Sequence, residues 1–337
     1  MTPENALTFH EMYPRVLRDV TTIPEHEICT RGNTSLEVLD VSFRIADPVQ
    51  RVPYLNSRPI NLAYNWAEVL WYLFGRDDLD MIGYYAPQMR QNSGDGRTLT
   101  GTAYGQPLFI TGPDGRTQWQ RVLDLLGKDP DSKRAVLSIF RPEELIRDNN
   151  PDVSCTIAAQ FLLRGGALHM TAYMRGNDAF MGMPSDVFSF TVLQELAAHQ
   201  LGVRVGHYSH HVGSMHVNLP NRAKVRKILA EVDAAGYRPP AFRFPAMPVD
   251  DCWTSLRLLM QEEAGLRANL HQHTGASVRE TGLDPYWQQV LLVFEVYRQI
   301  THTDQPVTRD VLGALDPGYQ WLIRHRWPKR MPEGAGA

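Results

Sequence analysis

The amino-acid sequence predicts an α+β fold in which one large mixed β-sheet is packed against helices. Two apolar runs, at 155–163 and 167–175, are separated by a short turn with two glycines, which is typical of a β-hairpin. Residues 184–200 begin at a proline and predict a helix, and residues 203–217 predict a further strand. This order of helices and strands favours a single sheet covered by helices.

Further elements are expected before the hairpin. Residues 33–44 alternate loosely between apolar and polar side chains and predict a strand. Residues 61–74 place apolar side chains on one helical face and predict a helix. A shorter helix is expected at 117–126, ended by Gly127, and a buried strand at 134–140. These segments complete the expected sheet and its helical cover.

A proline-rich break at 238–248 follows a helix expected at about 220–235. We interpret residues 1–248 as the sheet-containing catalytic domain and residues 249–337 as a helical C-terminal extension packed on it. Three helical patterns make up the extension, at about 250–270, 283–300 and 307–325.

Composition excludes several classes of protein. The 337 residues are 43% hydrophobic and 21% charged, which is an ordinary folded composition. The net charge of -3 argues against a nucleic-acid-coating protein, which needs a basic excess. The sequence has neither a signal-peptide pattern nor an apolar run of about 20 residues, so we expect a cytoplasmic protein without membrane spans. Cys29, Cys155 and Cys252 have neither disulfide-framework nor metal-site spacing.

Cys155 lies at the start of the first hairpin strand and is a candidate nucleophile. A cysteine at such a position is also typical of a small buried core residue. Antiparallel register places Arg175, at the end of the second strand, beside Cys155. A positive neighbour favours the thiolate, which is the reactive form of cysteine. The residues alone leave both interpretations open.

Basic pairs provide candidate phosphate sites. Lys133 and Arg134 follow a polar turn that leads into a strand, where paired cations can hold a phosphate. Arg31 lies in a short basic loop before the strand at 33–44. Each of these groups is equally typical of a solvated surface charge.

Glu68 lies among apolar residues of the helix at 61–74. Such a carboxylate either faces solvent or sits in the core as an acid or base. A group of histidines at His207, His210, His211 and His216 has no cysteine or acidic partner at metal-ligand spacing. We therefore expect no metal in the reaction.

Eight ordered segments resemble the signature of the thymidylate synthase family, and the resemblance spans about residues 30–222. They are Arg31-Gly32, Glu68–Trp71, Tyr104-Gly105, Asp129–Arg134, Ser154–Thr156 with Gln160-Phe161, Tyr173–Asp178, Gly182–Asp186 and Gly213–Asn218.

The resemblance implies a reaction on a pyrimidine nucleotide. Cys155 is expected to add to ring carbon 6, so that carbon 5 attacks the one-carbon unit of 5,10-methylenetetrahydrofolate. Glu68 is expected to organise water and proton transfers, with Tyr104 in the same network. Asp186 is expected to contact the base.

The resemblance also implies how the nucleotide is held. Arg31 and Arg175 are expected to bind the phosphate, and Lys133 and Arg134 to reach it from the partner subunit of a homodimer. Further substrate-binding positions carried over from the family signature are Gln160, Gly176, Asp178, His216 and Asn218.

Asp186 stands where thymidylate synthases have asparagine. An asparagine amide donates to the uracil carbonyl at position 4 and accepts from the ring imide. Cytosine offers an amino donor and a ring nitrogen that becomes protonated in the covalent adduct, and a carboxylate accepts from both. Asp186 therefore predicts a cytosine base; simple drift in a divergent relative is the alternative.

The segment between Gly75 and Tyr104 contains no tryptophan. Thymidylate synthases carry tryptophan there, and it shields the methylene intermediate for hydride transfer. Without this shield, water captures the methylene and the product carries a hydroxymethyl group, as in the cytidylate hydroxymethylase branch. The alternative is that another side chain supplies the same cover.

Asn218 replaces a family tyrosine that contacts the sugar together with the histidine matched by His216. The smaller side chain makes room for a 2'-hydroxyl, and Gly176 and Lys133 also depart from the family's phosphate-end residues. The sequence therefore predicts a CMP 5-hydroxymethylase, suited to nucleoside natural-product biosynthesis. The alternatives are a dCMP hydroxymethylase, a dUMP methylase, or an inactive homologue that binds nucleotide or RNA. The family's C-terminal tail that closes over folate has no counterpart in the extension.

Overall fold

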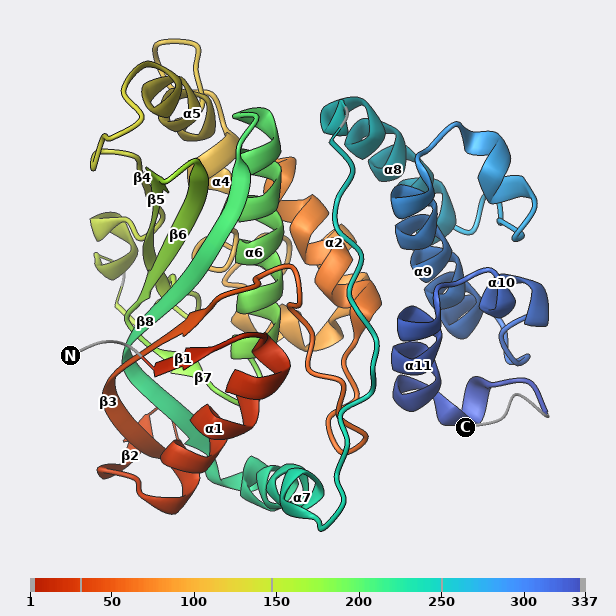
Figure 1. Cartoon of the computed structure of the whole chain (residues 1–337), viewed down its shortest axis with the longest axis horizontal. Coiled ribbons are helices and arrows are strands. Elements are labelled where there is room, and N and C mark those ends of the chain that lie inside the picture. The colour runs from red at the N-terminus through yellow and green to blue at the C-terminus, as the bar shows by residue number, and fades with distance from the viewer. Residues whose placement is uncertain (1–3, 31, 147, 250, 334–337) are drawn as a thin grey trace.

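The computed structural model describes residues 4–30, 32–146, 148–249 and 251–333. Its centre is one mixed sheet with the strand order β1-β3-β8-β6-β5-β4, and β2 pairs with β3 and β7 with β8 (Figure 1). The strands are β1 Glu4–Ala6, β2 His26–Thr30, β3 Asn33–Ile45, β4 Val136–Ser138, β5 Thr156–Arg164, β6 Ala167–Met174, β7 Asn177–Asp178 and β8 Arg204–Asn218.

The pairing of these strands confirms the predicted α+β class. β5 and β6 form the expected antiparallel hairpin, and β6 runs parallel to β8. β3 pairs antiparallel with β8 over most of its length, while β1 runs parallel to β3. Gly165 and Gly166 at the hairpin turn have positive φ values of 56° and 69°, a conformation that favours glycine.

Helices cover one face of the sheet, and a second group lies beyond α2 (Figure 1). The α-helices are α1 Phe9–Thr22, α2 Leu62–Leu73, α3 Leu79–Tyr85, α4 Gly105–Phe109, α5 Gln118–Lys128, α6 Met183–Gln200, α7 Arg222–Asp233, α8 Cys252–Arg267, α9 Pro285–His302, α10 Arg309–Gly313 and α11 Pro317–Arg326. Single 3₁₀ turns are η1 Pro87–Asn92, η2 Pro142–Leu145, η3 Leu219–Asn221, η4 Ser277–Thr281 and η5 Pro328–Arg330.

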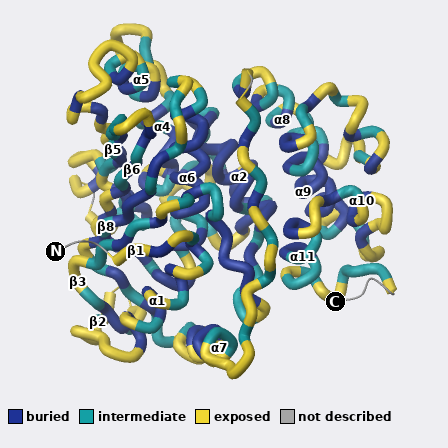
Figure 2. Tube along the Cα trace, in the orientation of Figure 1, coloured by how far each residue is buried: buried dark blue, intermediate teal, exposed yellow. Residues whose placement is uncertain are grey.

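α6 is buried along almost all of its length, because it lies between the sheet and α2 (Figure 2). Its buried Gln194 donates to the carbonyl oxygens of Leu168 in β6 and Gly206 in β8, at 2.9 and 3.0 Å. These bonds satisfy the buried NH₂ group of the side chain, which would otherwise be costly to bury. They also fasten α6 to the two central strands, and α6 carries the candidate residue Asp186 near its first turn.

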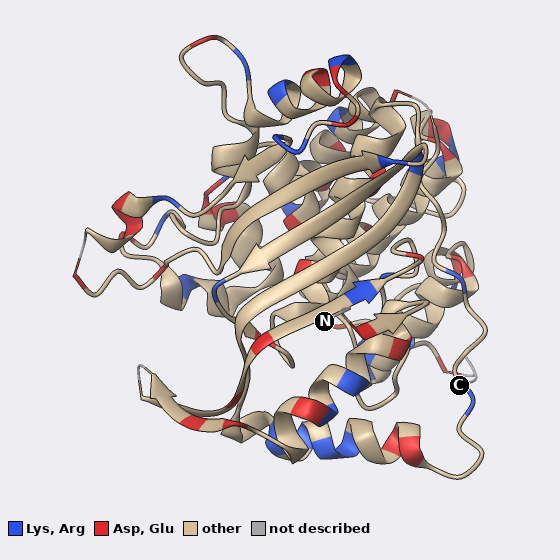
Figure 3. Ribbon diagram, turned by 60° about the vertical axis from the view of Figure 1, so that its left-hand side comes forward, with Lys and Arg blue, Asp and Glu red and all other residues tan. Residues whose placement is uncertain are grey.

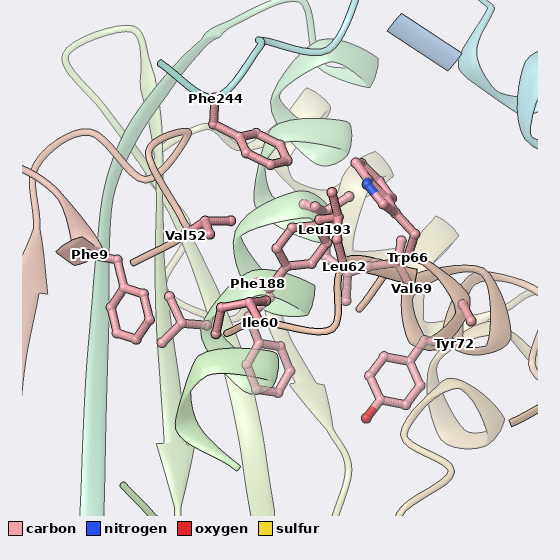
Figure 4. Packing of buried hydrophobic residues seen from close by; sticks show 14 of the residues in the cluster. Phe9, Val52, Ile60, Leu62, Trp66, Val69, Tyr72, Phe188, Leu193 and Phe244 are labelled. Carbon is pink, nitrogen blue, oxygen red and sulfur yellow. The ribbon is translucent and has the colours of Figure 1, made fainter. Parts of the chain in front are cut away.

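The core continues from the sheet layer into the C-terminal helices. Trp66 of α2 meets Phe188 of α6 edge-on at 5.1 Å between ring centroids, and Phe244 of the chain after α7 lies 5.7 Å from Phe188 (Figure 4). Trp66 also contacts Trp287 of α9 at 6.2 Å. Aromatic contacts of this kind add to the apolar area already buried. α9 therefore packs against α2.

Three element boundaries differ from the sequence-based predictions. α5 continues through Gly127 to Lys128, because a capping box at Thr117 starts the helix and Gly127 keeps a helical backbone. The strand expected at 134–140 is only Val136–Ser138, since it lies at the sheet edge with β5 as its partner. The helix expected at 307–325 is divided before Pro317, which cannot continue a helix.

The face of the sheet opposite the helices is open within the described part of the chain. In Figure 3 the strands lie at the front and the helices behind them. In β5, Ala159 and Phe161 are buried against the helices, so the half-buried Gln160 points to the other face. Tyr173 of β6 is 37% exposed on that face and donates to Gln160 at 3.3 Å.

Candidate active site

Cys155 directly precedes β5, and a register shift between Thr156 and Ala158 disrupts the ladder beside it. Such a bulge re-aims neighbouring side chains. The backbone amide of Arg175 donates to the backbone carbonyl of Cys155 at 2.8 Å. In addition, Nη2 of the Arg175 guanidinium lies 3.8 Å from the Cys155 sulfur. This confirms the proximity that the hairpin register predicts. Cys155 is half-buried, so it is not an ordinary core residue.

Arg175 is held in place by the chain before the cysteine. Its Nε and Nη2 atoms donate to the carbonyls of Ser154 and Val153, each at 2.9 Å. The guanidinium is therefore oriented before any substrate is present, which reduces the entropic cost of binding an anion there.

Asp186 receives a hydrogen bond at the end of a buried polar chain. The Tyr208 hydroxyl contacts His210 Nδ1 at 2.7 Å, and His210 Nε2 contacts the side-chain oxygen Oδ1 of Asn177 at 3.1 Å. Burial lowers the pKa of His210 to about 3, so this ring is neutral and Nε2 carries its one proton when Tyr208 donates to Nδ1. Asn177 then presents its amide to Asp186 Oδ2, at 2.7 Å.

The Asp186 carboxyl group is unusually basic for an aspartate. Burial and, after it, the charge of Glu68 raise its pKa from 3.8 to about 8, although the Asn177 hydrogen bond opposes the rise. At neutral pH the group is therefore mostly protonated in the absence of substrate.

Glu68 is buried in α2 and is not a solvated surface charge. Its two oxygens accept from Tyr64, at 2.5 Å, and from Ser189 of α6, at 2.8 Å. Burial raises the pKa of Glu68, while hydrogen bonds from Tyr64, Ser189 and Tyr72 oppose the rise. A buried carboxyl group with a raised pKa suits proton transfer near neutral pH.

Tyr104 completes the group. Its ring stacks on Tyr72 at 5.3 Å and on Phe190 at 6.1 Å. Burial raises the pKa of Tyr104 well above 10, and negative charge on Cys155 and Asp186 raises it further. The fold therefore brings together Cys155, Glu68, Tyr104 and Asp186 from four separate parts of the chain.

A cavity of about 530 Å³ adjoins this group. It shares Tyr64 and Ser185 with the surroundings of Glu68 and Asp186. Its remaining wall combines basic and aromatic side chains from distant segments: Arg58, Tyr85, Phe180, Lys224, Tyr297, Arg326 and Trp327. Cavities of this size that combine aromatic side chains with a few charged groups are typical of small-molecule sites.

Two cations of this cavity lie over Phe180, with Arg58 Cζ 4.5 Å and Lys224 Nζ 5.6 Å from its ring centre. Burial and then the neighbouring Arg58 lower the pKa of Arg326. Like charges gathered in this way favour an anionic ligand, which relieves their repulsion. The sequence analysis missed Arg58, Lys224, Arg326 and Trp327, because no local motif marks residues that meet only in the folded chain.

A second cavity, of about 410 Å³, is lined by Arg175, Gly176 and His216. Ile28 and Thr30 of β2, together with Glu37 and Ser214, form the rest of its wall. Arg31, the expected phosphate ligand after β2, lies outside the described residues.

The side chains of Asn218 and Asp178 are hydrogen-bonded to each other. Asn218 donates to Asp178 Oδ2 at 2.9 Å and accepts from Ser35 at 2.6 Å. The other Asp178 oxygen accepts from the amides of Phe180 and Met181. The Asn218 amide is thus fixed in orientation beside β7.

The structure does not bring every expected residue to this site. Lys133 and Arg134 follow α5 near the sheet edge and do not border the Arg175 cavity, and Arg134 pairs with Asp129 at 3.6 Å. Gln160 donates to the Lys133 carbonyl at 2.8 Å on the open face of the sheet. All three therefore lie away from Cys155 within one chain.

The fold and this constellation define a class of protein. A family model described as Thymidylate synthase matches residues 9–247, and the chain belongs to that family. A similar curated protein is the "Deoxyuridylate hydroxymethyltransferase" of Bacillus phage SP01, which is 31% identical over 226 residues. That match covers 63% of this chain and 58% of the relative, so the chain spans little more than half of that protein. Throughout the described ranges, each helix is too short or too polar to cross a bilayer.

Proposed function

We propose that this protein is a folate-dependent CMP 5-hydroxymethylase, which converts CMP, 5,10-methylenetetrahydrofolate and water into 5-hydroxymethyl-CMP and tetrahydrofolate. The observation that carries the proposal is the Cys155 sulfur, 3.8 Å from Arg175, in one group with Asp186, Tyr104 and Glu68.

Cys155 is the proposed nucleophile. Its thiolate adds to carbon 6 of the cytosine ring, and the electron pair of the 5,6 double bond becomes available at carbon 5. After carbon 5 has attacked the one-carbon unit, it loses its proton, and tetrahydrofolate leaves to give an exocyclic methylene. Water adds to this methylene, and expulsion of the thiolate from carbon 6 then restores the 5,6 double bond. The positive charge of Arg175 favours the thiolate form of Cys155, both before it adds to carbon 6 and after it is expelled.

Asp186 is the proposed reader of the base. In its protonated form, Oδ2 donates its proton to cytosine N3 and Oδ1 accepts from the exocyclic amino group. Addition of sulfur at carbon 6 makes N3 more basic, so the proton moves from Asp186 to N3. The resulting charge pair is formed only as the adduct forms, which lowers the barrier and not merely the binding energy.

We propose the 530 Å³ cavity as the folate site, because its aromatic walls suit a flat ring and its three cations suit glutamate carboxylates. The folate supplies the one-carbon unit. Tyr297, Arg326 and Trp327 belong to residues 249–337, so we propose that this extension serves as the cavity wall. It replaces the tail that closes over folate elsewhere in the family.

Hydroxymethylation, not methylation, is supported by two features. No tryptophan lies between Gly75 and Tyr104, and the phage relative is named a hydroxymethyltransferase. We propose that Glu68, with Tyr64 and Tyr104, orients the water that attacks the exocyclic methylene.

A ribonucleotide is proposed because Asn218 is short and is held back by Ser35 and Asp178. His216 and Gly176 border the same cavity as Arg175, where we place the sugar and phosphate. The second candidate substrate is dUMP, because the phage relative acts, by its name, on deoxyuridylate and a protonated Asp186 can also satisfy uracil.

We also propose a homodimer joined through the open sheet face. Gln160, Tyr173 and the nearby Lys133 and Arg134 would then lie against the partner, and the two cations would reach its phosphate. Sedimentation should report a dimer, and Tyr173→Glu should dissociate it. A fully active monomer would remove this part of the proposal.

The deciding experiment incubates the protein with 5,10-methylenetetrahydrofolate and CMP, dCMP or dUMP, and reads product masses. We expect a hydroxymethyl adduct of CMP, loss of turnover in Cys155→Ala, and normal turnover in the control Cys29→Ala, whose cysteine is exposed. A methylated product with formation of dihydrofolate would refute water capture. Full turnover by Cys155→Ala would refute the nucleophile.

A further inference from the structure

Three potential metal ligands converge in the C-terminal helices, away from the Cys155 group. Glu262 lies near the end of α8, and His271 and His273 follow the helix. The Nε2 atoms of both histidines are 3.0 Å from the same oxygen, Glu262 Oε2. One donor atom from each residue falls within 4.8 Å of the others.

The chain is shaped to make this approach. α8 ends at Arg267, and Asn269 just beyond it has a φ of 54°; the Leu270 amide donates back to the Gly265 carbonyl at 2.9 Å. This left-handed cap reverses the chain along its own helix. His271 and His273 are two residues apart in a non-helical stretch and turn to the same carboxylate.

Gly265 makes room for the first imidazole. A Cβ atom at this position would lie 2.1 Å from His271 Cε1, which is far inside van der Waals contact. The ring therefore lies flat against α8 only because residue 265 has no side chain. His273 is further held by its amide, which donates to Glu295 of α9 at 3.1 Å.

The geometry fits a small divalent cation. Zinc bonds to nitrogen and carboxylate oxygen at about 2.0–2.2 Å, so tetrahedral ligands are about 3.3 Å apart. The two observed separations of 3.0 Å need only a slight opening to admit the ion. Ser277 Oγ lies 3.4 Å from His273 Nδ1, the nitrogen that a metal at Nε2 leaves available for an orienting partner.

From this arrangement we propose that Glu262, His271 and His273 bind one Zn²⁺ ion, with water as the fourth ligand. By binding Glu262 of α8 together with His271 and His273, the ion links the segment after α8 to the helix. It thereby stabilises the α8–α9 part of the extension. The proposal is independent of the hydroxymethylase reaction and adds no metal to it. The sequence signal was His-Gln-His shortly after a helix that carries Glu262 and Glu263 near its end.

The test uses the full chain, stripped with a chelator, dialysed and titrated with Zn²⁺ by calorimetry. We expect one ion per chain, and binding at least about 100-fold weaker in Glu262→Gln and His273→Asn. The controls Glu280→Gln and His26→Asn change exposed residues and should bind normally. Zinc at about a hundredfold excess over its Kd should raise the Tm by about 4 °C in the wild type and in both controls, but not in the two ligand variants.

Two results would overturn the proposal. One is the absence of stoichiometric Zn²⁺ binding by the wild-type chain, which needs no variant to fold. The other is equal binding by the wild type and both ligand variants, with far-ultraviolet circular dichroism verifying that each is folded.

Discussion

Replacing Asp186 with asparagine changes charge but hardly changes shape, so Asp186→Asn tests both the stability and the specificity assigned to this carboxyl group. The raised pKa means that the folded protein holds a proton that the unfolded chain releases above its ordinary pKa of 3.8. Folding therefore becomes less favourable as pH rises from about 4 to about 8, and the penalty is absent below the ordinary pKa.

The size of this penalty follows from the two pKa values. At pH 7 it is about 1.36 × (7 − 3.8), or about 4 kcal/mol, as an upper limit. Asparagine has no such cost. Urea unfolding should show Asp186→Asn more stable than wild type, by a margin that grows by up to about 3 kcal/mol between about pH 5.5 and about pH 8. The control Asp304→Asn, at an exposed site, should show no such trend.

The same variant should change the choice of base. Asn177 donates to Oδ2, so the new amide must keep its oxygen there and turn its NH₂ group towards the base. That donor opposes the cytosine amino group and matches the uracil carbonyl. One mismatched pair costs about 1–3 kcal/mol, so the ratio of kcat/KM for CMP over UMP should fall by about 10- to 100-fold. An unchanged ratio, measured by product mass at saturating folate, would refute the assignment of Asp186.

The remaining predictions concern the proton, the sugar and the folate. In wild type, kcat/KM for CMP should decline above pH about 8 as Asp186 ionises, and the decline should vanish in Asp186→Asn; a profile common to both would contradict the proton donor role. Asn218→Tyr should shift the CMP-to-dCMP ratio towards the deoxyribonucleotide by about tenfold, and a constant ratio would end the sugar argument. Arg326→Ala should raise the KM for folate by about tenfold with little change in kcat, whereas the exposed control Lys329→Ala should not; equal KM values would exclude the extension from the folate site.

Local patterns were sufficient for much of the fold. Hairpin glycines set the register of β5 and β6, and this register alone placed Arg175 beside Cys155. Helix boundaries were less certain where tertiary contacts compete with local signals. Gly127 did not end α5, because its capping box and apolar face continue to stabilise the helix through that position.

The chain by itself determined which chemical groups are available and, through strand register, the pairing of the nucleophile with its guanidinium. Only the tertiary structure decided how those groups behave. The basicity of Asp186 depends on its burial beside Glu68 and on Asn177 oriented by His210, none of which is a sequence neighbour. A pKa depends on the distance to other charges and on how much water packing excludes. Both are set only when distant segments of the chain pack together.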